Sequence, residues 1–200
     1  IEKVKKAGNL PLAGKTFVVA GYGWCGRGLA LRARGMSAQV IVTEIDPIKA
    51  LEAKMDGYEV MPLQQAIRKA DIVLSATGNK HVIDEKALKI AKDGIILAQS
   101  GHFDIEINKE ALKKLSKKIT NIKPMVDEYD LGTKKIYLLG EGRLVNLAAA
   151  DGHPASVMDM SFAGQAFAAE YMWKNRGTLK HKVYTLPSVL DKKIAELKLK

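Results

Sequence analysis

Residues 15–35 read KTFVVAGYGWCGRGLALRARG, which is a short β-branched run, a glycine-rich turn and a helix-like segment. Gly21, Gly23 and Gly26 have the G-x-G-x-x-G spacing of a dinucleotide-binding loop. The first glycine allows a tight turn, the second lets the backbone approach a pyrophosphate, and the third lets the helix pack closely on the strand. The stretch therefore predicts the start of a βαβ unit that binds phosphates at the positive end of its helix.

An acidic residue follows the next predicted strand. Residues 39–43, QVIVT, end directly before Glu44, which lies about 20 residues after the glycine-rich loop. A carboxylate at this place accepts hydrogen bonds from the adenosine ribose and repels a 2′-phosphate, so it predicts NAD rather than NADP as the cofactor. The alternative is that Glu44 only leads into a helix capped by Asp46.

The alternation of short strands and helices continues along the chain. Asp46 and Pro47 supply an N-cap and a first helical position, and Gly57 ends that helix. Further strands are expected at residues 58–60, 71–78 and 95–100, with helices at 62–70 and 84–94. This order predicts an α/β fold, a Rossmann-type doubly wound parallel sheet with helices on both faces.

The pattern changes beyond residue 119. Residues 136–147, IYLLGEGRLVNL, indicate two strands around a Gly-Glu-Gly turn, a hairpin at the sheet edge. Residues 154–177 read as one long helix that ends at Gly177, a C-terminal helical extension. We therefore expect an NAD-binding domain over residues 1–150, and a hinge with a helical segment of another domain over residues 151–200.

Composition limits the classes of function. One cysteine excludes an internal disulfide framework and fits a reducing, cytoplasmic environment. No apolar run approaches the roughly 18 residues of a membrane span, and no metal site is predicted. The net charge of +10 is spread over lysine-rich segments in which acids and apolar residues interleave. We therefore predict neither a nucleic-acid partner nor a membrane partner.

Polar residues follow the fourth and fifth predicted strands, at the sheet edge where open α/β sheets bind ligands. Thr77 and Asn79 carry groups that bond a ribose or an amide, and Gly78 allows close approach of the backbone. An ordinary turn is the alternative for these three residues. Cys25 lies at a helix N-terminus, where the pKa of a thiol can fall, but a small space-filling residue is the favoured interpretation because no base lies nearby in sequence.

Two of the four histidines directly follow a glycine. His102 comes after Gly101 at the end of the fifth strand, and His153 comes after Gly152, shortly beyond Asn146. The Asn146 amide suits the carboxamide of a nicotinamide. Histidine titrates near neutral pH, so both rings are candidates for orienting hydroxyls or moving protons. The residues alone leave open whether either ring has a role in the site.

Four segments together carry a more specific resemblance. Residues 13–60, SGHFDIEI (100–107), EGRLVNLAAADGHP (141–154) and VMDMSFAGQA (157–166) resemble the S-adenosylhomocysteine hydrolase family. The resemblance runs in order from about residue 12 to the C-terminus. It implies reversible hydrolysis of S-adenosylhomocysteine to adenosine and homocysteine through NAD-dependent oxidation of the sugar, elimination, water addition and re-reduction.

The resemblance also implies roles for individual residues. His102 and His153 become the candidate catalytic residues, His102 near the sugar and His153 between cofactor and substrate. Lys49 departs from the pattern, because some members carry an asparagine there that bonds the adenosine ribose. The predicted cofactor-binding residues are Gly21, Gly23, Trp24, Cys25, Gly26, Arg27, Gly28, Glu44, Ile45, Thr77, Gly78, Asn79, Ser100, Gly101, His102, Asn146 and His153.

The same resemblance implies a longer enzyme. The chain begins with Ile1 rather than methionine, and family members place most of the substrate domain before the corresponding point. We therefore expect the isolated chain to be inactive, and the whole enzyme to be a homo-oligomer, a tetramer in the family. Two alternatives stay open at this point: a non-catalytic NAD-binding homologue that acts as a protein-interaction module, and an unrelated NAD-dependent hydroxy-acid dehydrogenase.

Overall fold

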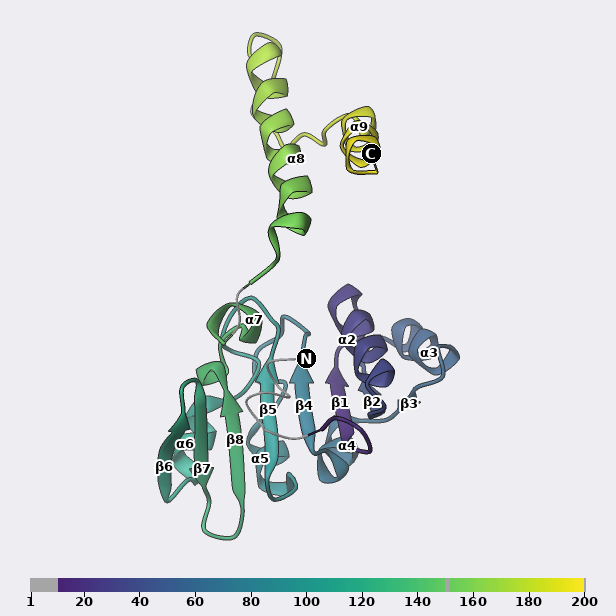
Figure 1. Cartoon of the computed structure of the whole chain (residues 1–200). Coiled ribbons are helices and arrows are strands. Elements are labelled where there is room, and N and C mark those ends of the chain that lie inside the picture. Colours follow the sequence, from purple (N-terminus) through teal and green to yellow (C-terminus); the bar gives the residue numbers. More distant parts are fainter. Residues whose placement is uncertain (1–10, 150–151, 200) are drawn as a thin grey trace. The chain divides into compact units, whose positions relative to one another are not determined.

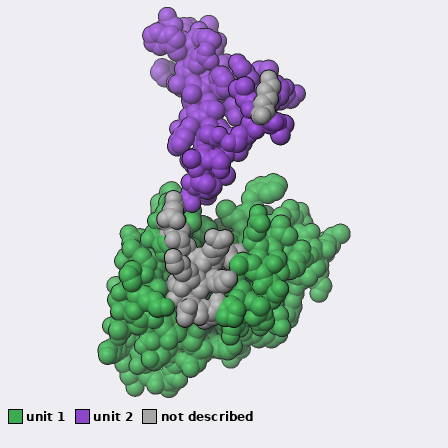
Figure 2. Space-filling view, in the orientation of Figure 1, with its two compact units in different colours: residues 1–150 green, residues 151–200 purple. Residues whose placement is uncertain are grey.

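The segment around the glycine-rich loop folds as a strand, a turn and a helix, as its sequence predicts. Strand β1 spans Thr16–Ala20 and helix α2 spans Trp24–Gly35. The structure is a computed structural model that describes residues 11–149 and 152–199. The chain divides into two units, residues 1–150 and 151–200, which are coloured separately in Figure 2 and are described one at a time.

The described strands of the first unit form one sheet in the order β3-β2-β1-β4-β5-β8-β7-β6 (Figure 1). The pairs from β3 to β8 are parallel, and the last two pairs are antiparallel. Besides β1, the strands are β2 (Gln39–Thr43), β3 (Glu59–Val60), β4 (Ile72–Ser75), β5 (Ile95–Gln99), β6 (Lys118–Lys123), β7 (Val126–Asp130) and β8 (Lys135–Leu139). The doubly wound, mostly parallel sheet that the sequence predicts is confirmed, with an antiparallel edge added.

Helices cover both faces of this sheet. They are α3 (Pro47–Met55), α4 (Leu63–Lys69), α5 (Glu85–Ile90), α6 (Lys109–Leu115) and α7 (Val145–Ala148). Buried residues of α2, α3 and α7 share one core cluster, and those of α4, α5 and α6 share another. The central strands are buried on both sides, which is why they read as continuous apolar runs rather than as alternating ones.

Side-chain caps fix where several helices begin. The carboxylate of Asp46 accepts a hydrogen bond from the backbone N–H of Ile48 at 2.9 Å, and Pro47 occupies the first turn of α3. Asp84 caps α5 in the same way, through the backbone N–H of Ala87 at 2.8 Å. These caps confirm the helix starts that the sequence predicts at both places.

The predicted hairpin over residues 136–147 is wrong. Only its first half is a strand, β8; the Gly-Glu-Gly segment forms the 3-10 turn η1 (Gly140–Gly142), and the rest forms α7. Gly140, Glu141 and Gly142 all have positive φ, at 62°, 56° and 71°, so the chain turns away from the sheet instead of returning along it. The edge hairpins form earlier, from β6 to β7 and from β7 to β8.

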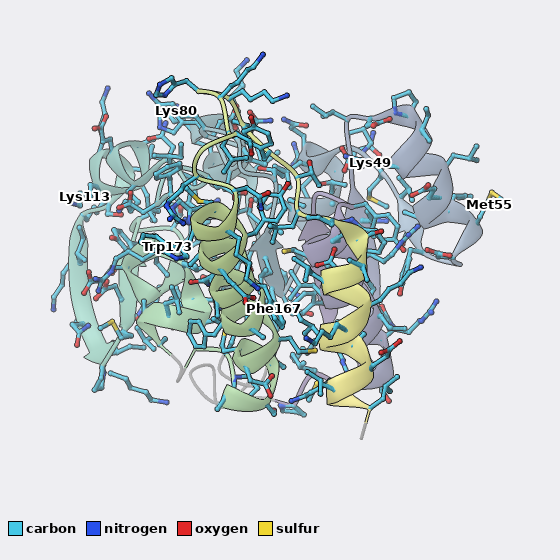
Figure 3. The ribbon with its side chains drawn as sticks, turned by 90° about the horizontal axis from the view of Figure 1, so that it is seen from above. Lys49, Met55, Lys80, Lys113, Phe167 and Trp173 are labelled. Atoms are coloured by element: carbon cyan, nitrogen blue, oxygen red, sulfur yellow. The ribbon has the colours of Figure 1, made fainter. Side chains whose placement is uncertain are left out.

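The described residues of the second unit form helices α8 (Ala155–Lys174) and α9 (Ser188–Lys198). The predicted long helix at 154–177 is confirmed, although it ends three residues early, at Lys174. The two helices contact each other; for example, the Lys193 ammonium lies 5.2 Å from the centre of the Phe167 ring. Phe167 and Trp173 are labelled on α8 in Figure 3, and Trp173 is 69% exposed. Among the described residues, no helix combines the length and the apolarity needed to cross a membrane.

Candidate functional site

The carboxyl ends of four parallel strands lie in one row. The register pairs Ala20 with both Thr43 and Ser75, and pairs Ser75 with Gln99. The loops that follow β1, β2, β4 and β5 therefore leave the sheet at the same edge. The strand order reverses at β1, between β2 and β4, which makes this edge the switch point where open α/β sheets bind ligands.

The glycine-rich loop has a tight turn, an open position and a close packing contact. Gly21 has a φ of +97°, and a Cβ there would lie 2.9 Å from the carbonyl oxygen of Ala76. A Cβ on Gly26 would overlap the carbonyl oxygen of Gly21, so the helix rests directly on the turn. At Gly23, apart from the glycine and its two neighbours, no atom of the described residues lies within 4 Å of the position of a Cβ. This open space is where a pyrophosphate can approach the backbone.

The start of helix α2 has features that suit an anion. Its N-cap, Gly23, makes no side-chain capping bond, so the first backbone N–H groups are not satisfied by a side-chain cap. Trp24, Cys25 and Gly28 are exposed at this end of the helix. N–H groups that no side chain caps, together with the positive end of the helix dipole, favour a phosphate at this place.

Glu44 is fixed in place by backbone N–H groups at the end of β2. Its Oε2 accepts from Tyr22 at 2.7 Å, and its Oε1 accepts from Ile45 at 2.7 Å and from Asp46 at 3.1 Å. Burial acts to raise the pKa of Glu44, but these three bonds and the charge of Lys49 hold it below its ordinary value. The carboxylate is therefore ionised at neutral pH, and its remaining lone pairs are available to ribose hydroxyls.

The cationic side chains near this carboxylate differ in their partners. Arg27 pairs with Glu52 at 3.0 Å and with Asp56 at 3.6 Å, on α3 and at its C-cap. Its guanidinium also lies 5.3 Å from the centre of the Tyr22 ring in the glycine-rich loop. Lys49, which is labelled in Figure 3, is exposed on α3. Of the two, Lys49 is the cation that acts on Glu44. A phosphate contact from Arg27, which the sequence-based prediction includes, would require these ion pairs to rearrange.

The loops after β4 and β5 are joined by an acid that the sequence reasoning missed. Glu106 has no exposed surface, and its carboxylate accepts hydrogen bonds from Thr77 and from the backbone N–H of Gly78. A Cβ on Gly101 would overlap the Glu106 carboxylate, so glycine is needed at that position. The available signal was a lone acid between two isoleucines in the segment IEI at 105–107. Acids in such apolar runs are rarely buried unless they are hydrogen-bonded.

Asn146 lies on α7 beside the end of β5. An isolated parallel bridge between Gln99 and Leu144 holds this helix at the same edge of the sheet. The Oδ1 atom of Asn146 is buried and has no hydrogen-bond partner among the described residues. A buried acceptor without a partner costs free energy, so a ligand that donates an N–H group there is favoured. The carboxamide of nicotinamide is such a donor, so the residues present fit NAD.

The two candidate histidines lie in different units. His102 is exposed in the first unit, with its ring edge-on to Phe103 at 4.7 Å between centroids. His153 follows Gly152, which has a φ of +77°, at the start of the described part of the second unit. Their meeting at one site therefore stays a prediction. Within residues 11–149 and 152–199, no group of three potential metal ligands occurs.

Comparison with known protein families shows to which family the chain belongs. Residues 1–152 match the family model described as S-adenosyl-L-homocysteine hydrolase, NAD binding domain. The chain belongs to this family. It is therefore an NAD-binding domain, and the alternative of an unrelated hydroxy-acid dehydrogenase is set aside.

Individual relatives are similar over the whole chain. The S-inosyl-L-homocysteine hydrolase of Methanocaldococcus jannaschii is 57% identical over 200 residues, which is 100% of this chain and 48% of that protein. The adenosylhomocysteinase of Archaeoglobus fulgidus is 56% identical over 199 residues, 100% of this chain and 49% of that protein. The chain thus spans about half the length of the curated relatives that it matches.

A solved structure supports the fold alone. It is a component of the dipicolinate synthase of Bacillus halodurans, which aligns with a TM-score of 0.54 at 15% identity over 57% of this chain and 40% of that chain. The match is consistent with the doubly wound sheet. At this identity it says nothing about the substrate.

Proposed function

We propose that this chain is the cofactor-binding part of an enzyme that hydrolyses S-adenosyl-L-homocysteine to adenosine and homocysteine. The observation that carries the proposal is a pair of groups at this edge of the sheet: the Glu44 carboxylate, which backbone N–H groups hold in place, and the Asn146 Oδ1 atom, which has no hydrogen-bond partner among the described residues. They suit the adenosine ribose and the nicotinamide of one dinucleotide. Bound NAD would supply the oxidation of the nucleoside 3′-hydroxyl and its later reversal.

The chain's own residues would bind and orient the reactants. The start of α2 holds the pyrophosphate, Glu44 with Ile45 holds the adenosine ribose, and the Thr77–Asn79 and Ser100–His102 loops face the second half of the cofactor. His102 and His153 orient the sugar hydroxyl and move its proton. The whole enzyme would act as a homo-oligomer in the cytoplasm, where the exposed Cys25 thiol stays reduced.

The nucleoside is the finer part of the proposal. Relatives named adenosylhomocysteinase and S-inosyl-L-homocysteine hydrolase are equally similar to this chain, at 56% and 57% identity. The test is homocysteine release by the full-length protein, supplied with S-adenosyl- and S-inosyl-homocysteine in parallel. Faster release from the adenosyl substrate supports the proposal, and faster release from the inosyl substrate replaces it with the alternative nucleoside. A protein that binds NAD and releases no homocysteine from either substrate is a non-catalytic homologue.

Glu44 is expected to make the chain prefer NAD over NADP. A 2′-phosphate would face the ionised carboxylate, and like charges brought together cost several kcal/mol, so we expect about 100-fold weaker binding of NADP. Glu44→Ala should weaken the binding of NAD about tenfold and narrow the difference in affinity between NAD and NADP. The control is Glu85→Ala, at a half-buried acid on α5. Calorimetric titration measures the affinity of each of the three proteins for both cofactors. Equal affinity of the unchanged chain for both cofactors contradicts the assignment of Glu44.

The 200-residue chain alone is expected to release no homocysteine from S-adenosylhomocysteine. It spans about half the length of its curated relatives, and the family resemblance places further proton-transfer groups in the remainder. A thiol-detecting assay on the purified chain with added NAD measures the release. Turnover above that of a no-protein blank would show that the chain holds every group that the reaction needs.

A further inference from the structure

Glu106 is a buried acid to which the proposed function gives no role. It follows the loop after β5, and its exposed surface is 0%. Removing an ionised carboxylate from water is costly unless hydrogen bonds or opposite charges compensate. Within the described residues no salt bridge to Glu106 is present, so the compensation comes from hydrogen bonds.

Four donors from a single turn converge on this carboxylate. Oε2 accepts from the Ser75 hydroxyl, from the Thr77 backbone N–H at 3.0 Å and from the Thr77 hydroxyl at 2.8 Å. Oε1 accepts from the Gly78 backbone N–H at 3.0 Å. Because an ionised carboxylate only accepts, it matches four donors without leaving any of them opposed by another donor. The turn at the end of β4 is thus held by one side chain.

Glu106 is itself held in place on the other side. Its backbone N–H donates to the Gln99 side-chain oxygen at 3.2 Å, and its carbonyl accepts from Ile83 at 3.0 Å. The Gln99 amide in turn donates to the carbonyl of Phe103 at 2.6 Å. The loop after β5 and the turn after β4 are therefore joined in one hydrogen-bond network, and Glu106 is at its centre.

This hydrogen-bond network borders the glycine-rich loop. A Cβ on Gly21 would lie 3.1 Å from the Thr77 Cγ2 atom and 2.9 Å from the Ala76 oxygen, so the turn packs directly against Gly21. In a doubly wound sheet one half carries the adenosine part of a dinucleotide and the other half carries the second nucleotide. Glu44 marks the first half, at β2. The Glu106 network lies at β4 and β5, in the second half of the sheet.

We propose that Glu106 is a positioning residue, which holds the Ser75–Gly78 turn where the nicotinamide half of NAD meets the sheet. The proposal rests on the proposed function for its cofactor. It assigns Glu106 no contact with NAD itself. It predicts that loss of the carboxylate weakens contacts to the nicotinamide half and leaves the adenosine half unchanged.

The test compares NAD with ADP, which carries only the adenosine half and the phosphates. Glu106→Gln keeps the size of the side chain but places an amide NH₂ against at least one N–H or O–H donor of the turn. We expect NAD to bind about tenfold more weakly, the loss for one failed hydrogen bond to a charged group, and ADP to bind within about twofold of the unchanged chain. Calorimetry on the 200-residue chain measures both ligands.

Two further variants keep the result interpretable. Glu110→Gln, an exposed acid on α6, should change neither affinity. Ser75→Ala removes one buried donor and should weaken the binding of NAD by a smaller factor, about threefold, without changing the binding of ADP. If Glu106→Gln does not fold, the comparison of NAD with ADP in Ser75→Ala tests the positioning role. Equal weakening of NAD and ADP, or unchanged NAD binding in both variants, overturns the positioning role. An unchanged chain that binds neither ligand instead overturns the proposed function, and this inference with it.

Discussion

Gly26→Ala is expected to abolish the cofactor site. The added Cβ would overlap the carbonyl oxygen of Gly21. The overlap cannot be relieved by a rotamer change, because the position of a Cβ is fixed by its own backbone and the oxygen is itself a backbone atom. The helix must then move off the turn, which costs about 1–3 kcal/mol of folding stability for an overpacked site. The N–H groups at the start of α2 move with it. We expect NAD to bind about 100-fold more weakly or worse, which corresponds to about 2.8 kcal/mol.

A matched substitution in the same helix controls for the change of residue type. Gly35 is exposed at the end of α2. A Cβ placed on it would have no atom within 4 Å in the part of the chain that the structure describes, apart from its neighbours and the backbone of its own helix. Gly35→Ala should therefore leave NAD binding unchanged and stabilise the domain by up to about 1 kcal/mol, because alanine favours a helix over glycine. Thermal unfolding and calorimetry measure both effects. If Gly26→Ala has the same unfolding temperature and the same affinity for NAD as Gly35→Ala, the cofactor site does not need the packing contact between Gly26 and Gly21.

The second large effect is expected at the two glycine–histidine pairs. In the full-length protein, His102→Ala and His153→Ala should each lower turnover about 10²–10⁴-fold, the usual cost of losing one positioned acid-base or orienting group. NAD affinity should change by less than about threefold, since each ring is proposed to contact the reacting sugar rather than the pyrophosphate. Steady-state kinetics and NAD titration of the same preparations separate the two quantities.

His181 provides the control for this pair. It is exposed in the second unit, as it would be if it had no part in the site, so His181→Ala should keep full turnover. Full turnover in either of the other two variants contradicts the role assigned to that histidine. Equal losses of turnover and NAD affinity would place the ring against the cofactor instead of the sugar.

The sequence predicts the first half of the sheet well because each element there carries a local signal. Strands β1 and β4 are continuous apolar runs, Asp46 caps α3, and the three glycines fix the loop between β1 and α2. Such signals act over a few residues, so they can be read without knowing the rest of the fold. The position of Glu44 at the end of β2 follows from the same local pattern.

The antiparallel edge could not be predicted in this way. Strand β6, KITNIK, is mostly exposed and lacks the continuous apolar run of a central strand. The segment after β8 contains apolar residues typical of a strand, yet three successive positive φ angles turn it into α7. An apolar run shows that a segment is buried, but it does not say which secondary structure buries it.

Sequence reasoning missed Glu106, in the second half of the sheet, for a different reason. Glu106 receives its four hydrogen bonds from Ser75, Thr77 and Gly78, which lie about thirty residues earlier. Long-range hydrogen bonds of this kind leave no periodic trace in the sequence. Asn146, by contrast, is named as a candidate from the sequence, although its position beside β5 depends on the long-range bridge between Gln99 and Leu144.

A crystal structure of the chain grown with NAD tests the central claim most directly. The account predicts the pyrophosphate at the start of α2, both adenosine ribose hydroxyls donating to the Glu44 carboxylate, and the nicotinamide carboxamide donating to the Oδ1 atom of Asn146. An adenosine ribose bound away from Glu44, or a nicotinamide that leaves Asn146 Oδ1 without a partner, would contradict it.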